Sequence, residues 1–307
     1  MANGNRNRIK GLLCGVMAML AAALCSCAAY APKDTPPAVR QPLREALTNE
    51  DEIIASIRSG LRAYSSRITV SFTYGSDILD ELSALTGEWV ETALEETEDP
   101  CEGDYIRYQY GGYESTCRYA VENGVYRYTV EIVPDYYIYY AQEQETPALL
   151  EEVYEELALG EDATDYEKLR AIYDYVCSHV KYDKVHQKSK YYHAKSTAYA
   201  ALSRHTATCQ GYSVLLYRML RENGIDCRVV TGLGMEDAGE RLHAWNIAAL
   251  DGKYYNLDAT WDAGAEEYRF FLRGSSDFEN HAAGDAFQTE AFLNRYPMAA
   301  EAYRPVG

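Results

Sequence analysis

Apolar and polar residues alternate with different periods along the chain, and the periods predict its elements. Helical spacing in the segment from Asp51 predicts a short helix, with apolar positions at Ile53, Ile54, Ile57 and Leu61. RITVSFTY and the tyrosine-rich run over 105–133 alternate like strands, and Gly-Gly and Asn-Gly pairs separate them as turns. Residues 51–147 are therefore expected to form a small Tyr-rich α+β domain.

A series of predicted amphipathic helices begins near residue 164. Thr164 and Glu167 have capping-box spacing, and one helical face follows, made of Leu169, Ile172, Tyr173, Val176, Cys177 and Val180. A short helix is predicted from Ser196 to Leu202, and a longer one starts at Cys209, with Thr208 as its N-cap and Gly224 at its end. We assign 148–307 to a second domain.

The sequence RLHAWNIAALDGKYYNLDATWD predicts a hairpin around Asp251-Gly252. With a two-residue turn, Trp245 lies opposite Asp258, so His243 is on the same face and is a diagonal neighbour of Asp258. An imidazole and a carboxylate can close that distance with a hydrogen bond. A three-residue turn would reverse the parity and remove the pair.

The N-terminus has the pattern of an export signal. Three basic residues precede the short apolar run GLLCGVMAMLAAALCS, and LCSC then resembles a bacterial lipobox with Cys27 as the lipid-modified residue. We expect 1–27 to be a lipoprotein signal peptide and the proline-rich 28–50 to be a tether. The expected location is the cell membrane, facing outside the cytoplasm; the alternative is secretion after cleavage at Ala31.

Composition excludes some classes of partner and cofactor. The formal net charge of −18 argues against nucleic acid as a partner, because phosphate binding needs a basic surface. Five of the eight cysteines lie beyond the signal, so an exported chain keeps at least one unpaired thiol, and a Cys101–Cys117 disulfide stays open. Without Cys-x-x-Cys after the signal, and without a calcium-loop pattern, we expect no metal or other cofactor.

Cys209 is the candidate nucleophile. The helix N-terminus favours a thiolate there, and Gly211 is expected to leave the approach open. His243 would deprotonate the thiol, Asp258 would hold the His243 tautomer, and the thiolate would attack an amide carbonyl. The Cys209 backbone N–H would bind the oxyanion, with Gln210 or Tyr199 as candidates for a second donor.

Three motifs carry a family resemblance: CQGYS at 209–213, HAWN at 243–246 and NLDATWD at 256–262. With flanking matches over roughly 150–290, the chain resembles the bacterial transglutaminase-like superfamily. The resemblance implies a papain-like α+β core, in which the nucleophile helix packs on an antiparallel sheet. It also implies acyl transfer on peptide or glutamine amides through a thioester. True papain-type proteases separate Cys and His more widely than this chain does.

We expect an exported cysteine peptidase or amidase that acts on a protein or peptide, for example a cell-wall peptide. Protein cross-linking is one alternative, and a non-catalytic binding module that retains the fold is another. For single residues, a Cys209–Cys227 disulfide, a structural core His243 and a turn or cap role for Asp258 also stay open. The sequence leaves the substrate and the oligomeric state undetermined.

Overall fold

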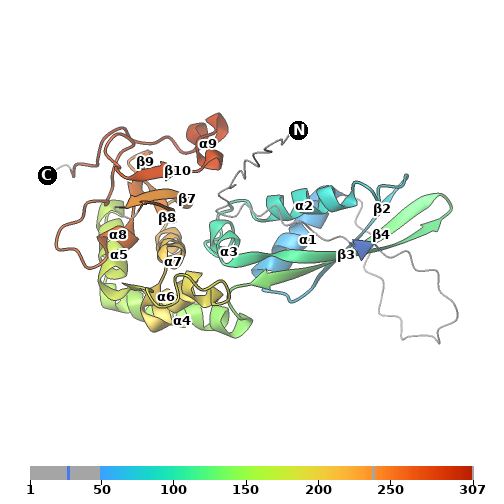
Figure 1. Ribbon diagram of the computed structural model, residues 1–307, viewed down its shortest axis with the longest axis horizontal. Helices are drawn as coiled ribbons and strands as arrows, with labels where there is room; N and C mark the ends of the chain where they lie inside the picture. The colour runs from blue at the N-terminus through green and yellow to red at the C-terminus, as the bar shows by residue number, and fades with distance from the viewer. Residues whose placement is uncertain (1–25, 28–48, 237–238, 306–307) are drawn as a thin grey trace, which may run out of the picture.

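The computed structural model describes residues 26–27, 49–236 and 239–305 (Figure 1). The expected signal segment up to residue 25 and the tether over 28–48 lie outside the described residues. None of the helices described is long and apolar enough to cross a membrane.

The N-terminal part is a four-stranded sheet packed against two helices. The sheet has the order β1-β3-β4-β2, and only the β1–β3 pair is parallel. Its elements are β1 (Ser26–Cys27), α1 (Glu50–Arg62), β2 (Ile68–Tyr74), α2 (Leu82–Ala93), α3 (Asp104–Arg107), β3 (Tyr110–Glu122) and β4 (Val125–Tyr136). The expected Asn123-Gly124 turn joins β3 to β4, with φ of 52° and 77°. Apolar residues of the two helices and of the three longer strands share one core.

The C-terminal part is built around one buried helix and one antiparallel sheet. The sheet has the order β10-β7-β8-β9, and α7 packs against it (Figure 1). The helices are α4 (Tyr140–Leu157), α5 (Asp165–His179), η1 (His193–Ser196), α6 (Ala198–Arg204), α7 (Cys209–Glu222), α8 (Ala259–Asp262), η2 (Asp285–Phe287) and α9 (Glu290–Arg295). The strands are β5 (Lys181–Tyr182), β6 (Thr206–Ala207), β7 (Cys227–Glu236), β8 (Gly239–Leu250), β9 (Lys253–Leu257) and β10 (His281–Ala283).

Local sequence signals account for several of these elements. The predicted capping box at Thr164 is present and starts α5. The Asp251-Gly252 turn has φ of 51° and 76°, which both residue types tolerate, and Leu250 pairs with Lys253. The two-residue turn and the parity expected of the β8–β9 hairpin are therefore confirmed.

The fold is α+β, with α7, which starts at Cys209, on an antiparallel sheet and a small α+β unit before it. The two parts are not separated cleanly at residue 147, because α4 runs through that position. Cys101 and Tyr105, from the N-terminal side, pack in the core that surrounds α7. Cys101 is a free thiol, so the Cys101–Cys117 disulfide left open by the sequence is absent.

Buried ion pairs join the two parts. Arg228 on β7 makes a forked contact with Asp104 on α3, at 2.7 Å and 3.1 Å, and lies 3.3 Å from Glu96. Asp104 also accepts the Val229 backbone N–H at 2.8 Å, and its own N–H donates to Glu96 at 2.6 Å. We call Glu96, Asp104 and Arg228 the interdomain clasp.

Candidate active site

Cys209 is the first residue of α7, as predicted. It is half-buried, whereas Cys101, Cys117, Cys177 and Cys227 are buried. Thr208 occupies the N-cap position but does not cap the helix with its side chain, because its hydroxyl bonds to the Lys195 carbonyl at 3.2 Å. The first N–H groups of α7 are therefore left without a side-chain acceptor from Thr208, and they favour an anion at this end.

Gly211 has a different role from the one expected. A Cβ at this position would lie 2.7 Å from the Ala207 Cβ, 3.0 Å from the Lys195 carbonyl oxygen and 3.1 Å from the Thr197 carbonyl oxygen. The glycine therefore lets the first turn of α7 pack against the backbone of η1 and the start of α6. It sets the position of the helix start rather than opening an approach for substrate.

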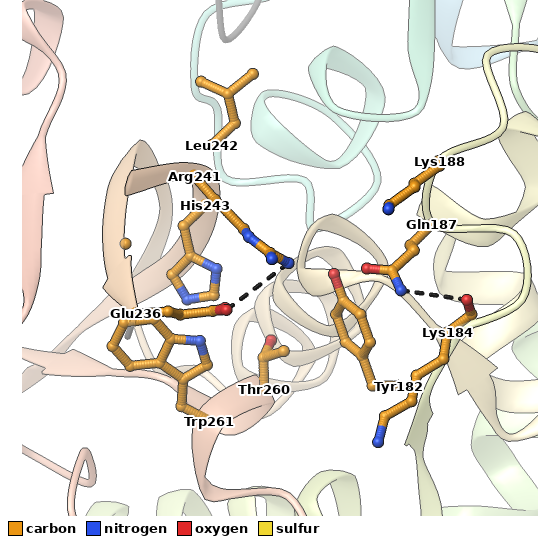
Figure 2. A pocket seen from close by; sticks show the side chains of 11 residues that line it. Tyr182, Lys184, Gln187, Lys188, Glu236, Arg241, Leu242, His243, Thr260 and Trp261 are labelled. Carbon is orange, nitrogen blue, oxygen red and sulfur yellow. Dashed lines mark hydrogen bonds and ion pairs between the residues drawn. The ribbon is translucent and has the colours of Figure 1, made fainter. Parts of the chain in front are cut away.

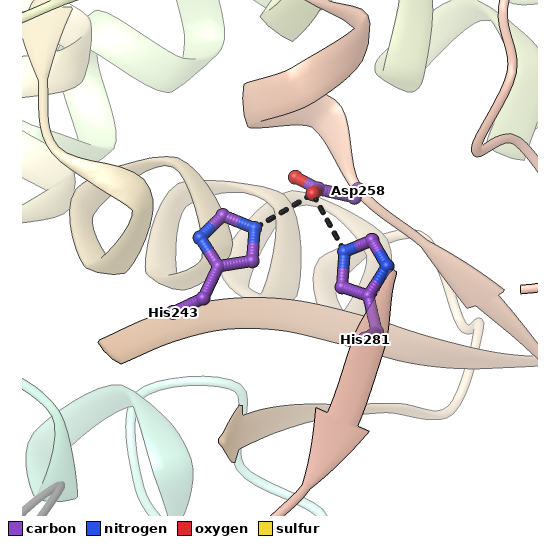
Figure 3. A group of neighbouring side chains, drawn as sticks. All are labelled: His243, Asp258 and His281. Atoms are coloured by element: carbon purple, nitrogen blue, oxygen red, sulfur yellow. Dashed lines mark hydrogen bonds and ion pairs between the residues drawn. The ribbon is translucent and has the colours of Figure 1, made fainter. Parts of the chain in front are cut away.

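His243 on β8 bonds to Asp258, which follows β9. The distance from His243 Nε2 to Asp258 Oδ2 is 2.7 Å, and both side chains are buried (Figure 3). Burial lowers the pKa of His243, but the Asp258 carboxylate and the contact with Cys209 outweigh it and raise the pKa to about 10. Because Nε2 is occupied by Asp258, Nδ1 is the ring nitrogen left for the Cys209 side chain.

Asp258 also caps a helix, so the alternative role foreseen for it exists beside the His243 contact. Its Oδ1 accepts the backbone N–H groups of Thr260 at 2.9 Å and Trp261 at 3.2 Å, at the start of α8. Burial raises the pKa of Asp258, but the charges and hydrogen bonds of His243 and His281 lower it to about 2. The carboxylate is thus held in one orientation by contacts on both oxygens.

His281 on β10 is the residue that the sequence analysis missed. Its Nε2 lies 3.0 Å from the same Asp258 oxygen that His243 contacts (Figure 3). No turn or periodicity links it to the hairpin, since it reaches Asp258 only because β10 pairs with β7 at the other edge of the sheet. Nothing local in the sequence around His281 marks it as part of the site.

His243, Asp258 and His281 also form the one cluster in the described part of the chain that could hold a metal ion. Both Nε2 atoms lie at hydrogen-bond distance from Asp258 Oδ2, at 2.7 Å and 3.0 Å. An ion held at about 2 Å by all three groups would require both Nε2 atoms to give up their protons. The contacts observed are those of a hydrogen-bonded triad.

A cleft of about 640 Å³ opens beside His243 (Figure 2). One side comes from β7, β8 and α8, and the other comes from the segment after α5. The cationic residues of its lining are Lys184, Lys188 and Arg241, the last paired with Glu236 at 3.7 Å. The Tyr182 hydroxyl points into the opening between Arg241 and Gln187 (Figure 2).

The two residues suggested as second oxyanion donors already donate hydrogen bonds to groups outside the cleft. The Gln210 amide donates to the Tyr108 carbonyl, and the Tyr199 hydroxyl donates to Glu145 at 2.7 Å. Tyr182 is the better placed group, because it lines the cleft with His243. Burial, followed by the charge of Cys209, raises the pKa of Tyr182 to about 12, so its hydroxyl keeps its proton near neutral pH.

The sequence of this part matches a known family. Residues 154–259 match the model of the Transglutaminase-like superfamily, and the match includes Cys209, His243 and Asp258. The matched residues make up about a third of the chain, and they are what this chain shares with that superfamily. His281 lies beyond the matched residues.

Two curated proteins are similar to part of this chain. Both are named Kyphoscoliosis peptidase: the human protein is 33% identical over 133 residues, and the mouse protein is 33% identical over 114 residues. These matches cover 41% and 34% of this chain, and 20% and 17% of the relatives, so the chain spans about a fifth of their length. A crystal structure of a TGase aligns over 66% of this chain and 52% of its own, at 18% identity and a TM-score of 0.33.

Proposed function

We propose that the chain is a cysteine-dependent acyltransferase that hydrolyses peptide or glutamine amides. Cys209 is the nucleophile, His243 the general base and acid, and Asp258 the residue that orients His243. The observation that carries this proposal is the buried His243–Asp258 bond of 2.7 Å, with the remaining ring nitrogen facing a half-buried thiol at a helix start. A binding module with no chemistry would gain nothing from that arrangement.

In the first half of the reaction, His243 Nδ1 takes the Cys209 proton, and the thiolate forms a C–S bond with the amide carbon. The carbonyl electron pair moves onto oxygen, which the Cys209 backbone N–H and the Tyr182 hydroxyl stabilise. When the intermediate collapses, the C–N bond breaks and His243 gives its proton to the leaving amine. A thioester on Cys209 remains.

In the second half, His243 Nδ1 removes a proton from water, and the hydroxide oxygen attacks the thioester carbon. The C–S bond breaks, the electron pair returns to sulfur, and a carboxylic acid leaves. An amine in place of water would give a new amide, which is the cross-linking alternative. The peptidase name of the two relatives favours water as the acceptor.

A thiol probe tests the pairing of Cys209 with His243. Burial raises the pKa of Cys101 to about 12 and that of Cys177 still further, so these thiols are poor competitors for the probe. We expect iodoacetamide to label Cys209 selectively at neutral pH, and the His243→Ala variant to label much more slowly. Peptide mass spectrometry of the labelled site gives the readout.

Cys209→Ser supplies the control for that labelling, since it removes the proposed site and leaves the other cysteines. If Cys209 is labelled equally in wild type and His243→Ala across the pH range, His243 does not activate the Cys209 thiol and the proposed mechanism is wrong. A casein-like protein with a tagged amine then separates the two acceptors. Release of ammonia or new termini without tag incorporation supports hydrolysis, and tag incorporation supports cross-linking.

We also propose that the enzyme is exported and held at the outer face of a membrane by lipid on Cys27. The support is the basic, apolar and lipobox pattern of the first residues. Metabolic labelling with an alkyne fatty acid in a bacterial host tests it. Incorporation that is unchanged in Cys27→Ala would contradict the anchor.

A further inference from the structure

Asp258 is shared between two imidazoles, and the proposed triad uses only one of them. Oδ2 accepts from His243 at 2.7 Å and from His281 at 3.0 Å, while Oδ1 accepts the two backbone N–H groups of α8. The Asp258 side chain is fully buried. A buried carboxylate with this many donors is held as an anion in one orientation.

Both ring nitrogens of His281 face oxygen acceptors. Nε2 meets the Asp258 carboxylate, and Nδ1 lies 2.8 Å from the backbone carbonyl oxygen of Glu279. A carbonyl oxygen only accepts, and so does an ionised carboxylate. A neutral imidazole has one N–H and can satisfy one of the two contacts, whereas the imidazolium satisfies both.

The surroundings of His281 also suit a cation. Its side chain is 1% exposed and is enclosed by four aromatic rings. The ring centroids lie 3.9 Å (Phe278, stacked), 4.3 Å (Trp261), 5.0 Å (Trp245) and 5.3 Å (Phe270) from the imidazole. The Phe278 ring is stacked face to face on the imidazole, and an aromatic face at this distance attracts positive charge. The titratable groups that contact this ring in the described part of the chain are Asp258 and His243, whose ring centroid is 5.4 Å away.

We propose that His281 is a positioning residue that works as a buried imidazolium, completing a His243–Asp258–His281 relay. Its charge keeps Asp258 ionised and fixed against His243. The same charge opposes the pull of Asp258 on the His243 proton, so His243 can release that proton to the leaving amine. The part concerning catalysis rests on the proposed function, whereas the charge state of His281 does not.

Nuclear magnetic resonance of the full chain with ¹⁵N-labelled histidine tests the charge state. We expect the two ring nitrogens of His281 to show the imidazolium pattern at about pH 8, where an ordinary histidine is neutral. The signal is assigned by its loss in His281→Gln. A neutral His281 pattern at that pH would overturn the proposal.

The pH dependence of Cys209 alkylation tests the effect on His243. His281→Gln keeps an N–H donor for Asp258 but removes the charge, so we expect the upper inflection of the profile to rise by on the order of 1 pH unit. His281→Phe also removes the donor, and we expect a roughly tenfold or greater further loss of turnover. His193→Gln, which alters an exposed histidine stacked on Tyr137, is the matched control and should leave the profile unchanged.

A His281→Gln profile that superimposes on wild type, in a protein whose labelling still depends on His243, would defeat this proposal alone. Labelling that is independent of His243 would instead defeat the proposed function. In that case the charge state of His281 is still decided by the magnetic resonance experiment. The two failures are therefore distinguishable.

Discussion

At the scale of single residues, existing hydrogen bonds decide which polar side chains can take part in the proposed chemistry. Gln210 and Tyr199 follow or precede Cys209 closely in sequence, yet their side chains bond to Tyr108 and Glu145. The Tyr182 hydroxyl makes no hydrogen bond with another described residue and points into the cleft (Figure 2). A free donor beside the nucleophile is what an oxyanion needs.

Tyr182→Phe should therefore lower kcat by roughly 10²-fold and leave KM nearly unchanged, since the lost hydrogen bond forms only in the transition state. Steady-state kinetics on a chromogenic amide provide the measurement. Tyr199→Phe is the matched control, because it removes a hydroxyl that bonds to Glu145, and it should retain wild-type kcat. Equal kinetics for wild type and Tyr182→Phe would rule out the role of this hydroxyl.

At the scale of elements, the start of α7 is the critical junction, because it carries Cys209 and packs on the backbone before it. Gly211→Ala would bring a methyl group to 3.0 Å and 3.1 Å from two carbonyl oxygens that cannot move independently of the chain. We expect a loss of about 1–3 kcal/mol in the free energy of unfolding and a large fall in Cys209 labelling. Urea denaturation and the thiol probe measure the two effects.

Gly87 in α2 offers the comparison, since it is also helical but has only an ordinary contact at 3.7 Å. Gly87→Ala should be neutral or stabilising by up to about 1 kcal/mol, because alanine is the better helix former. If both substitutions changed the free energy of unfolding equally, close packing would not explain why position 211 is a glycine.

At the scale of the whole molecule, the interdomain clasp couples the two parts. Arg228→Met would leave Asp104 and Glu96 buried without their cation, with side chains 1% and 7% exposed. We expect a loss of about 3–5 kcal/mol in the free energy of unfolding. Arg170→Met, which breaks a half-exposed pair with Asp174, should cost no more than about 0.5 kcal/mol. Urea denaturation should show a much larger loss in the free energy of unfolding for Arg228→Met than for Arg170→Met. Similar losses in the two variants would argue against a stabilising role of the interdomain clasp.

The clasp also predicts a pH dependence. Burial and the nearby Asp104 charge raise the pKa of Glu96 to about 8, although Arg228 opposes them. The folded protein therefore binds more protons than the unfolded chain between the ordinary glutamate pKa and about pH 8, so this group's stabilisation is lost as pH rises through that window. The slope from Glu96 should reach at most about 1.4 kcal/mol per pH unit.

Glu96→Gln removes this titration and keeps a side chain of similar size. Urea denaturation at a series of pH values should show that the difference in stability between wild type and variant falls as pH rises from 5 towards 8. A difference that is constant with pH would mean that Glu96 does not change protonation in that range.

The sequence by itself determined the local features of the site. A capping box placed α5, the helix start placed Cys209, and the parity of a two-residue turn put His243 and Asp258 on one face. These features follow from the periods of helix and strand and from the conformational tolerance of Asp-Gly, which act over a few residues.

Only the tertiary structure decided the contacts between distant segments. His281 reaches Asp258 through a strand that pairs at the far edge of the sheet, and Arg228 meets Asp104 across 124 residues. The role of Gly211 depends on η1 packing against α7. Such contacts have no period in the sequence, because they depend on how completed elements stack. The positions of the proposed nucleophile and of its proposed base were therefore predictable, while the residues that contact them from distant segments were not.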